Sequence, residues 1–478
     1  MSLKIKAISG VKWTTISTVV VAILQLLQLS ILTRFLNPSD FGSMALVMVV
    51  IGFSQAFLDM GISNAIIYKQ EISHEQLSTL YWVNVLSGFI VFVITVLISP
   101  LVSIFYGEPE LKKLIIIVGI TFIIQPFGQQ FMILWQKEMR FRGIAKIDII
   151  TKTVSLFFST FLAYKGFGVY ALVYGRILAV TCQTALYVFN GLNEHRPSFI
   201  FKINNIGEFL SFGLYQMGEK TINYFNSQFD TILIGKLIGL EALGIYNIAK
   251  QLILKPIDII GPIITKVTFP TMAKIQNEKT RLKNIYLKTL NYLSSVILPI
   301  YILLIILAPE IILLLFGKKW LEAIPILQIL SVYGILRSIG SPVGSLLLAK
   351  GKANWGFWWN FFFLFYVPIG IYISSYWGMI GISWGLVIMA ISGTIPNWFF
   401  LVRPLCGAKF IEYHLSYLLP LTISSIVFIL LFLLKYFLEF SPIVNTIYIS
   451  ILSFIMFTFL NRWLNNQFYE DLFSLYRK

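Results

Sequence analysis

Two neighbouring stretches of the sequence carry polar and charged side chains at helical spacing within otherwise apolar surroundings. Residues three or four positions apart lie on one face of a helix, so each stretch predicts a helix with one polar face. Glu219 and Lys250 lie beside these faces. The faces consist of Gln216, Lys220, Asn223, Ser227 and Asp230 in the first stretch and of Asn247, Gln251, Lys255 and Asp258 in the second.

A weaker version of the same pattern occurs near the N-terminus. A charged group at the centre of a bilayer costs about 2.5–3.5 kcal/mol, so such groups normally face a bundle interior or water. Four helices with polar faces therefore predict a wet cavity. Two alternatives stay open: uncharged residues often bond only to a neighbouring helix, and Lys220 with Glu219 could form a salt bridge that fixes packing. The N-terminal faces consist of Thr14, Thr18, Gln25 and Gln28, followed by Gln55, Asp59 and Ser63.

The composition requires a membrane environment for these helices. The chain has 478 residues, of which 57% are hydrophobic and 12% charged, whereas soluble domains carry about 25% charged residues. The two cysteines cannot build a disulfide framework, and the sequence has no GxxxxGK[ST], HExxH or GxSxG motif. We therefore expect an integral membrane protein that is not an enzyme and does not hydrolyse ATP.

Apolar runs of about 20 residues are long enough to cross a bilayer. Lys and Arg accumulate in alternate loops, which predicts that both termini are cytoplasmic. Much of the +16 net charge is thus a topology signal, and it gives no support for nucleic acid binding. Arg176 and Arg337 fall within spans, and cavity lining is the less favoured interpretation for both. The fourteen predicted spans are 13–33, 42–65, 81–103, 114–136, 148–164, 167–190, 209–235, 243–265, 291–315, 323–347, 355–376, 378–402, 413–434 and 443–461.

The chain repeats its pattern after roughly two hundred residues. Residues 31–42 match 233–244, and residues 168–175 match 378–385. Six spans separate the paired segments, and an even number preserves direction, so the repeats are parallel and the substrate site lies between them. We predict an all-α membrane protein with a six-helix N-lobe over 1–190, a cytoplasmic amphipathic linker over 191–208, a parallel six-helix C-lobe over 209–402, and two C-terminal spans with a cytoplasmic tail over 403–478.

Three segments resemble a known family. Residues 32–42, LTRFLNPSDFG, are similar to the end-of-first-helix signature of polysaccharide transport proteins, and residues 57–65, FLDMGISNA, follow in the second-helix position. These proteins are Wzx-type flippases of the multidrug/oligosaccharidyl-lipid/polysaccharide (MOP) exporter superfamily. Residues 219–226, EKTINYFN, resemble the subgroup near the colanic and teichuronic acid exporters. The resemblance covers the whole chain and implies the MATE-like fold of that superfamily.

The resemblance implies a bacterial inner-membrane protein that moves oligosaccharides on undecaprenyl pyrophosphate from the inner to the outer leaflet by alternating access. A cavity cation would compensate the pyrophosphate charge, and a lysine, as a point charge, would release it again. We assign that role to Lys220, Lys255 and Lys250. The side chains expected to meet the sugar are Gln216, Asn223, Gln25, Gln28 and Gln251, and the candidates for H⁺ or Na⁺ coupling are Asp59, Glu219, Asp230 and Asp258.

Other functions stay open at this point. An ion-coupled multidrug or toxin antiporter of the same superfamily favours an acidic cavity, and the buried lysines argue against it. A membrane-embedded glycan polymerase or ligase usually has a large outer loop, which the predicted spans do not leave room for. We expect membrane lipids and a polysaccharide polymerase machinery as partners, a functional monomer, and neither a metal nor an organic cofactor.

Overall fold

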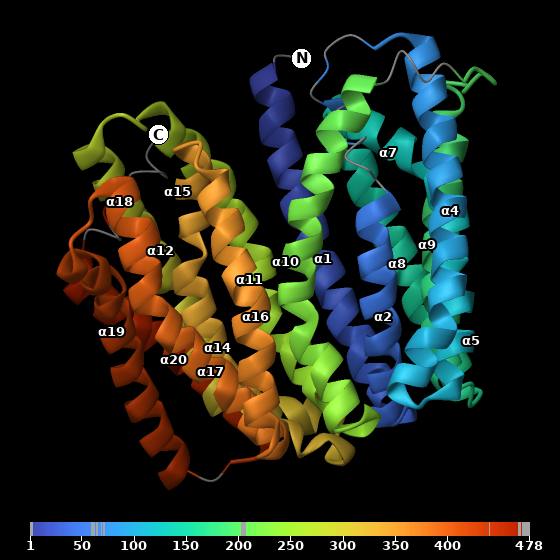
Figure 1. Cartoon of the computed structure of the whole chain (residues 1–478). Coiled ribbons are helices and arrows are strands. Elements are labelled where there is room, and N and C mark those ends of the chain that lie inside the picture. The colour runs from blue at the N-terminus through green and yellow to red at the C-terminus, as the bar shows by residue number, and fades with distance from the viewer. Residues whose placement is uncertain are drawn as a thin grey trace. The chain divides into compact units, whose positions relative to one another are not determined.

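The computed structural model describes residues 3–58, 63, 66, 67, 69, 72–201, 207–438, 440–466 and 470. The side chains of 3–8, 56, 207–220, 262–264, 266, 267 and 353 lie outside the description as well. Within these residues the chain is helical and contains no strand (Figure 1). It divides into two compact units, Met1–Gly244 and Ile245–Lys478.

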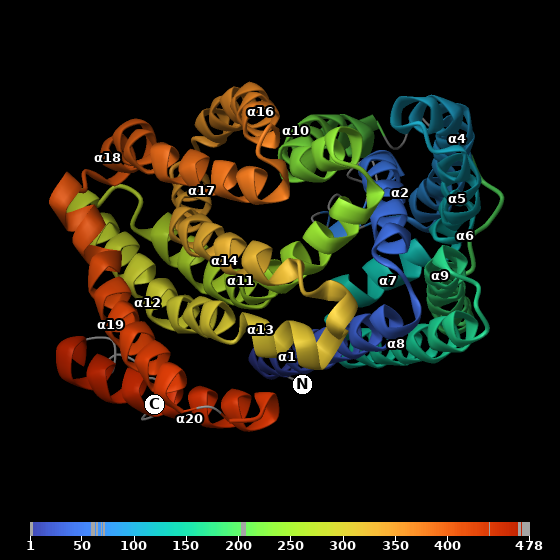
Figure 2. The ribbon, with the colours of Figure 1, turned by 90° about the horizontal axis from the view of Figure 1, so that it is seen from below.

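The first unit contains nine helices and the start of a tenth in its described part. They are α1 (Leu3–Phe35), α2 (Pro38–Leu58), α4 (His74–Tyr106), α5 (Pro109–Gly119), α6 (Thr121–Ile124), α7 (Pro126–Lys137), α8 (Phe141–Tyr164), α9 (Val169–Gly191) and α10 (Gly207–Leu237), followed by the first residues of α11 (Leu240–Lys274). Helices α1, α8 and α9 lie side by side (Figure 2). Helix α10 packs along α2 within this unit.

The second unit continues α11 and adds the rest of the chain. Its helices are α12 (Lys279–Ile306), α13 (Ala308–Ile311), η2 (Ile312–Phe316), η3 (Lys318–Trp320), α14 (Ala323–Gly340), α15 (Pro342–Ala349), α16 (Ala353–Ser375), α17 (Gly378–Asn397), η4 (Trp398–Val402), α18 (Arg403–Cys406), α19 (Phe410–Phe437) and α20 (Pro442–Leu464). The unit boundary falls after α10, whereas the predicted lobe boundary precedes it. The six-helix lobes, and the linker between them, therefore stay a prediction.

The helices are long and apolar enough for a multi-pass membrane protein. Among the described residues, ten can span a bilayer by length and composition, and eleven spans result if the bent pair Pro109–Ile124 and Pro126–Lys137 counts as one. The bend of 51° falls at Pro126, whose ring cannot continue the hydrogen-bond ladder. The three other predicted spans correspond to helices α2, α10 and α11. Some side chains of these helices lie outside the description, so the total of fourteen spans remains a prediction.

Two segments that correspond in the sequence repeat, 31–42 and 233–244, cross each other at close range. A Cβ atom built on Gly42, near the start of α2, would overlap the carbonyl oxygen of Leu240, at the start of α11. A Cβ atom on Gly244 would likewise overlap the carbonyl oxygen of Pro38. Pro38 and Gly42 are the repeat counterparts of Leu240 and Gly244, so the contact is reciprocal. Only glycine permits backbones to approach this closely at both positions.

This crossing predicts that Gly42→Ala destabilises the protein. The new methyl group meets backbone atoms, which cannot rotate away, so the helices must separate at a cost of about 1–3 kcal/mol. Equilibrium unfolding in mixed micelles measures the change. Gly344→Ala, in α15, is the matched control because no atom lies within 4 Å of its Cβ position, and it should leave stability unchanged or raise it. Equal stability of Gly42→Ala and the wild type would contradict the crossing.

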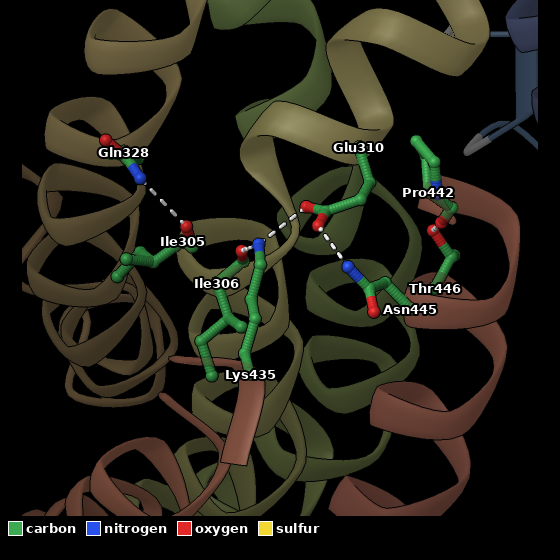
Figure 3. A network of polar contacts seen from close by, with 8 residues as sticks. All are labelled: Ile305, Ile306, Glu310, Gln328, Lys435, Pro442, Asn445 and Thr446. Atoms are coloured by element: carbon green, nitrogen blue, oxygen red, sulfur yellow. Dashed lines mark hydrogen bonds and ion pairs between the residues drawn. The ribbon is translucent and has the colours of Figure 1, made fainter. Parts of the chain in front are cut away.

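A polar network fixes the last two helices to the second unit (Figure 3). Lys435 Nζ, on α19, donates to Glu310 Oε2 at 2.7 Å and to the carbonyl oxygen of Ile306 at 2.7 Å. Asn445 Nδ2, on α20, donates to Glu310 Oε1 at 3.2 Å. The Glu310 side chain is 7% exposed, so its charge depends on these two partners. At the other end of α20, Asn465 Nδ2 donates to Ser295 Oγ of α12 at 3.1 Å.

Candidate functional site

The predicted cavity residues of the first helix make a contact inside the first unit. Gln28 Nε2 donates to Ser159 Oγ of α8 at 2.7 Å and lies 3.5 Å from Ser155 Oγ. Ser155 Oγ in turn donates to the carbonyl oxygen of Gly175 on α9 at 3.1 Å. Gln28 therefore joins α1 to α8, which agrees with the alternative that it bonds across to a neighbouring helix. Gln25, one turn away, is half-buried and also has a polar partner.

Helix α10 presents part of its predicted polar face. Asn223 is exposed, and Asp230 Oδ1 accepts a hydrogen bond from the backbone N–H of Thr231 at 2.7 Å. Tyr224 Oη donates to the carbonyl oxygen of Val49 on α2 at 2.8 Å and so fixes the rotation of the helix. The side chains of Gln216, Glu219 and Lys220, and all of Asp59, lie outside the described residues. Their roles remain those predicted from sequence.

In the second unit, α11 carries a cluster of charged side chains. Lys250 is buried, with 8% exposure, whereas Gln251 and Lys255 are half-buried and Asp258 is exposed. Asp258 lies within electrostatic range of Lys255 and of Arg337 on α14. Two cationic side chains, Lys255 and Arg337, thus accompany one carboxylate, so the formal charge of these three residues is positive. The sequence analysis did not assign Arg337 to the cavity, because no sequence spacing relates it to α11.

A tyrosine holds the two helices of this cluster in register. Tyr301 Oη, on α12, donates to the carbonyl oxygen of Ile253 at 2.6 Å, in the turn before Pro256. The same ring packs against Gly334 of α14, three residues before Arg337, where no side chain could be accommodated. Tyr301 is fully buried, so the contact is shielded from water. Tyr301 therefore packs between the stretches of α11 and α14 that carry Lys255 and Arg337.

The sequence analysis also missed polar residues within α8 and α9. Asp148 Oδ1, on α8, accepts a hydrogen bond from Gln183 Nε2 of α9 at 3.3 Å, and Lys152 lies one turn further along α8. Arg176 of α9 was noted in the sequence, but cavity lining was not the favoured interpretation for it. The sequence did contain a signal for such residues, because charged side chains occur within two of the predicted membrane spans. Such charges are rare in membranes and usually functional.

The segment after α9 docks on the first turns of α4. His74 Nε2 lies 2.9 Å from Ser198 Oγ, and Trp82 Nε1 donates to the carbonyl oxygen of Ser198 at 3.0 Å. The Trp82 and Phe199 rings stack at 4.7 Å. His195 lies against the His74 ring at 4.8 Å, and its Nε2 is buried with no hydrogen-bond partner. The described part of the predicted linker is thus held by specific contacts.

This docking predicts a pH-dependent linker. Burial, and secondly the positive charge of a protonated His74, lower the pKa of His195 below its ordinary value. The folded state therefore binds this proton less readily than the unfolded state, so the docking is stable above about pH 6.5 and weakens as the pH falls. Glu194, the nearest carboxylate in sequence, is already paired with Arg140. Hydrogen exchange of residues 195–201, corrected for the intrinsic pH effect, should accelerate severalfold between about pH 7.5 and 5.5. His195→Gln should abolish that acceleration, and an unchanged pH response in this variant would contradict the prediction.

Comparisons with known proteins identify the class of fold. A solved structure titled lipid II flippase MurJ, in an inward closed conformation, superposes with a TM-score of 0.77 over 98% of this chain and 100% of the other, at 16% identity. An inward-facing multidrug resistance transporter of the MATE family has a TM-score of 0.61 over 78% of this chain and 93% of its own. The chain therefore has the fold of the MOP superfamily, as the sequence resemblance implied.

The family follows from sequence similarity. Residues 31–325 match the family described as polysaccharide biosynthesis protein. The lipopolysaccharide biosynthesis protein WzxC of Escherichia coli is 34% identical over 89% of this chain and 86% of its own length. The teichuronic acid biosynthesis protein TuaB of Bacillus subtilis is 34% identical over 80% of each chain. The chain belongs to this family of polysaccharide biosynthesis proteins, which confirms the family predicted from sequence.

Proposed function

We propose that this protein is a flippase that moves undecaprenyl-pyrophosphate-linked oligosaccharides from the inner to the outer leaflet of a bacterial inner membrane. The observation that carries the proposal is the charged cluster of Lys255, Asp258 and Arg337 within the helices of the second unit. An excess positive charge in an apolar medium is costly unless an anion binds there. A pyrophosphate group is such an anion, and the names of the relatives concern surface polysaccharides.

The remaining residues have proposed roles in the same cycle. Lys220, Lys255 and Lys250 compensate the pyrophosphate, and Lys250 acts from a buried position. Alternating access exposes the cavity first to the cytoplasm and then to the outer face, with both termini cytoplasmic. The protein acts as a monomeric transporter rather than an enzyme, and passes its product to a polymerase machinery. The proposed sugar contacts are Gln216, Asn223, Gln25, Gln28 and Gln251, and the proposed coupling residues for H⁺ or Na⁺ are Asp59, Glu219, Asp230 and Asp258.

Lipid analysis of a deletion strain tests this proposal. The strain should accumulate undecaprenyl-linked oligosaccharide on the inner leaflet and lose its surface polysaccharide, and expression of the wild-type chain should reverse both effects. A drug-sensitivity panel on the same strain distinguishes the flippase from a multidrug antiporter. Loss of an antiporter should increase drug sensitivity and leave the lipid intermediates normal. Normal lipid intermediates in the deletion strain would refute the flippase.

A further inference from the structure

One guanidinium group lies deep within a membrane helix of the first unit. Arg176 is the eighth residue of α9, Val169–Gly191. With a rise of 1.5 Å per residue, it lies about 10 Å from the start of the helix. An arginine at this depth cannot reach water at the helix end by the extension of its side chain alone. Its charge must therefore be compensated within the protein.

The described residues do not provide this compensation. Arg176 Nε is buried and has no hydrogen-bond partner, and Arg176 forms no ion pair in the part of the chain that the structure describes. Other arginines differ in this respect. Arg140 pairs with Glu138 and Glu194, and Arg403 lies over the Trp398 ring.

The nearest acidic residue on the packed helix is already engaged. Asp148 accepts the hydrogen bond from Gln183, which lies seven residues after Arg176 on α9. Seven residues correspond to about two turns, or 10 Å of helix. The carboxylate thus bonds to an amide about two turns from Arg176, and the described residues leave the guanidinium without a counter-charge.

Packing also fixes the orientation of α9 next to Arg176. The preceding residue, Gly175, lies so close to α8 that a Cβ atom there would be 2.7 Å from Ser159 Cβ. Its carbonyl oxygen accepts the hydrogen bond from Ser155 Oγ at 3.1 Å. The contact fixes the rotation of α9 at this level, and in that orientation the Arg176 Nε atom is buried.

We infer that Arg176 is an anion-binding residue that receives a phosphate oxygen. A guanidinium group presents planar paired donors, which match phosphate better than the single charge of a lysine does. The preferred source of this phosphate is the pyrophosphate of the lipid-linked cargo, and in this respect the inference rests on the proposed function. It adds an arginine on α9 to the residues proposed to bind the anion.

Binding of two defined anionic lipids tests the inference. The full-length protein is placed in phosphatidylcholine nanodiscs and titrated with undecaprenyl pyrophosphate or with phosphatidylglycerol. Arg176→Gln should weaken binding of the pyrophosphate lipid by more than about tenfold, and Arg176→Lys should weaken it less. Arg403→Gln is the matched control, because it removes the same charge from a residue that lies over aromatic rings. It should bind as the wild type does.

The outcomes separate this inference from the flippase proposal. If the wild type binds undecaprenyl pyrophosphate and Arg176→Gln binds it equally well, the anion site is refuted and the flippase stands. If the wild type binds only phosphatidylglycerol, and does so through Arg176, the anion site stands with a membrane lipid as its ligand, and the flippase proposal fails. If Arg176→Gln does not fold, Arg176→Lys decides: binding weakened about threefold supports the paired-donor contact, and unchanged binding overturns it.

Discussion

Replacing both Lys220 and Lys255 by glutamine is expected to abolish export of the lipid-linked glycan at normal protein levels. Glutamine is one atom shorter than lysine but stays polar and uncharged, so the main effect of the change is to remove the two charges. Loss of one buried charge partner typically costs 2–5 kcal/mol, so two losses should lower export at least about a hundredfold. The measurement is the rate at which surface polysaccharide recovers in a deletion strain that expresses the variant.

The control for this double variant removes the same number of charges elsewhere. Lys112 and Lys113 are exposed neighbours in α5, and their replacement by glutamine should leave export unchanged. Full export by the Lys220→Gln, Lys255→Gln variant would refute the cationic cavity. Equal loss in both double variants would show that net charge, rather than the proposed roles of Lys220 and Lys255, governs export.

Replacing Glu310 by glutamine is expected to destabilise the second unit by about 3 kcal/mol. Removal of one partner from a buried ion pair leaves the other charge uncompensated and usually costs 3–5 kcal/mol. The lower end of that range applies because the Lys435 side chain is 21% exposed and keeps its hydrogen bond to the Ile306 carbonyl. Equilibrium unfolding in mixed micelles, followed by tryptophan fluorescence, measures the loss.

A second substitution distinguishes the uncompensated charge from a packing defect. Adding Lys435→Met to Glu310→Gln removes the remaining charge and should restore most of the lost stability. Glu278→Gln is the matched control, because Glu278 pairs with Arg281 at 3.5 Å on an exposed surface, where an ion pair contributes less than about 1 kcal/mol. A double variant no more stable than Glu310→Gln would contradict the ion-pair explanation.

The sequence predicted the elements well because membrane helices are defined by local composition. Runs of apolar residues must form helices in lipid, where every backbone group needs an internal partner. The shortest predicted span, 148–164, corresponds to α8, Phe141–Tyr164, which is long enough to span. The family resemblance, carried by local motifs near the first two helices, was confirmed for the same reason.

Contacts between distant residues were not predictable in this way. Nothing in the local sequence of α14 indicates that Arg337 lies near Asp258, because the approach depends on Tyr301 packing between helices. Gln28 has the same spacing signal as a cavity residue and as a helix-packing residue, and its contact with Ser159 could be found only in the structure. The docking of Ser198 on α4 likewise joins residues about 120 positions apart.

The most direct measurement of the central claim is leaflet exchange in reconstituted vesicles. Purified protein is inserted into liposomes that contain undecaprenyl pyrophosphate bearing a labelled oligosaccharide, and a membrane-impermeant enzyme or quencher reports the fraction of label on the outer leaflet. The flippase predicts that the label becomes fully accessible with the wild type and remains about half accessible with the Lys220→Gln, Lys255→Gln variant. The account is contradicted if the label in wild-type vesicles stays as accessible as in protein-free liposomes, both with and without a proton or sodium gradient.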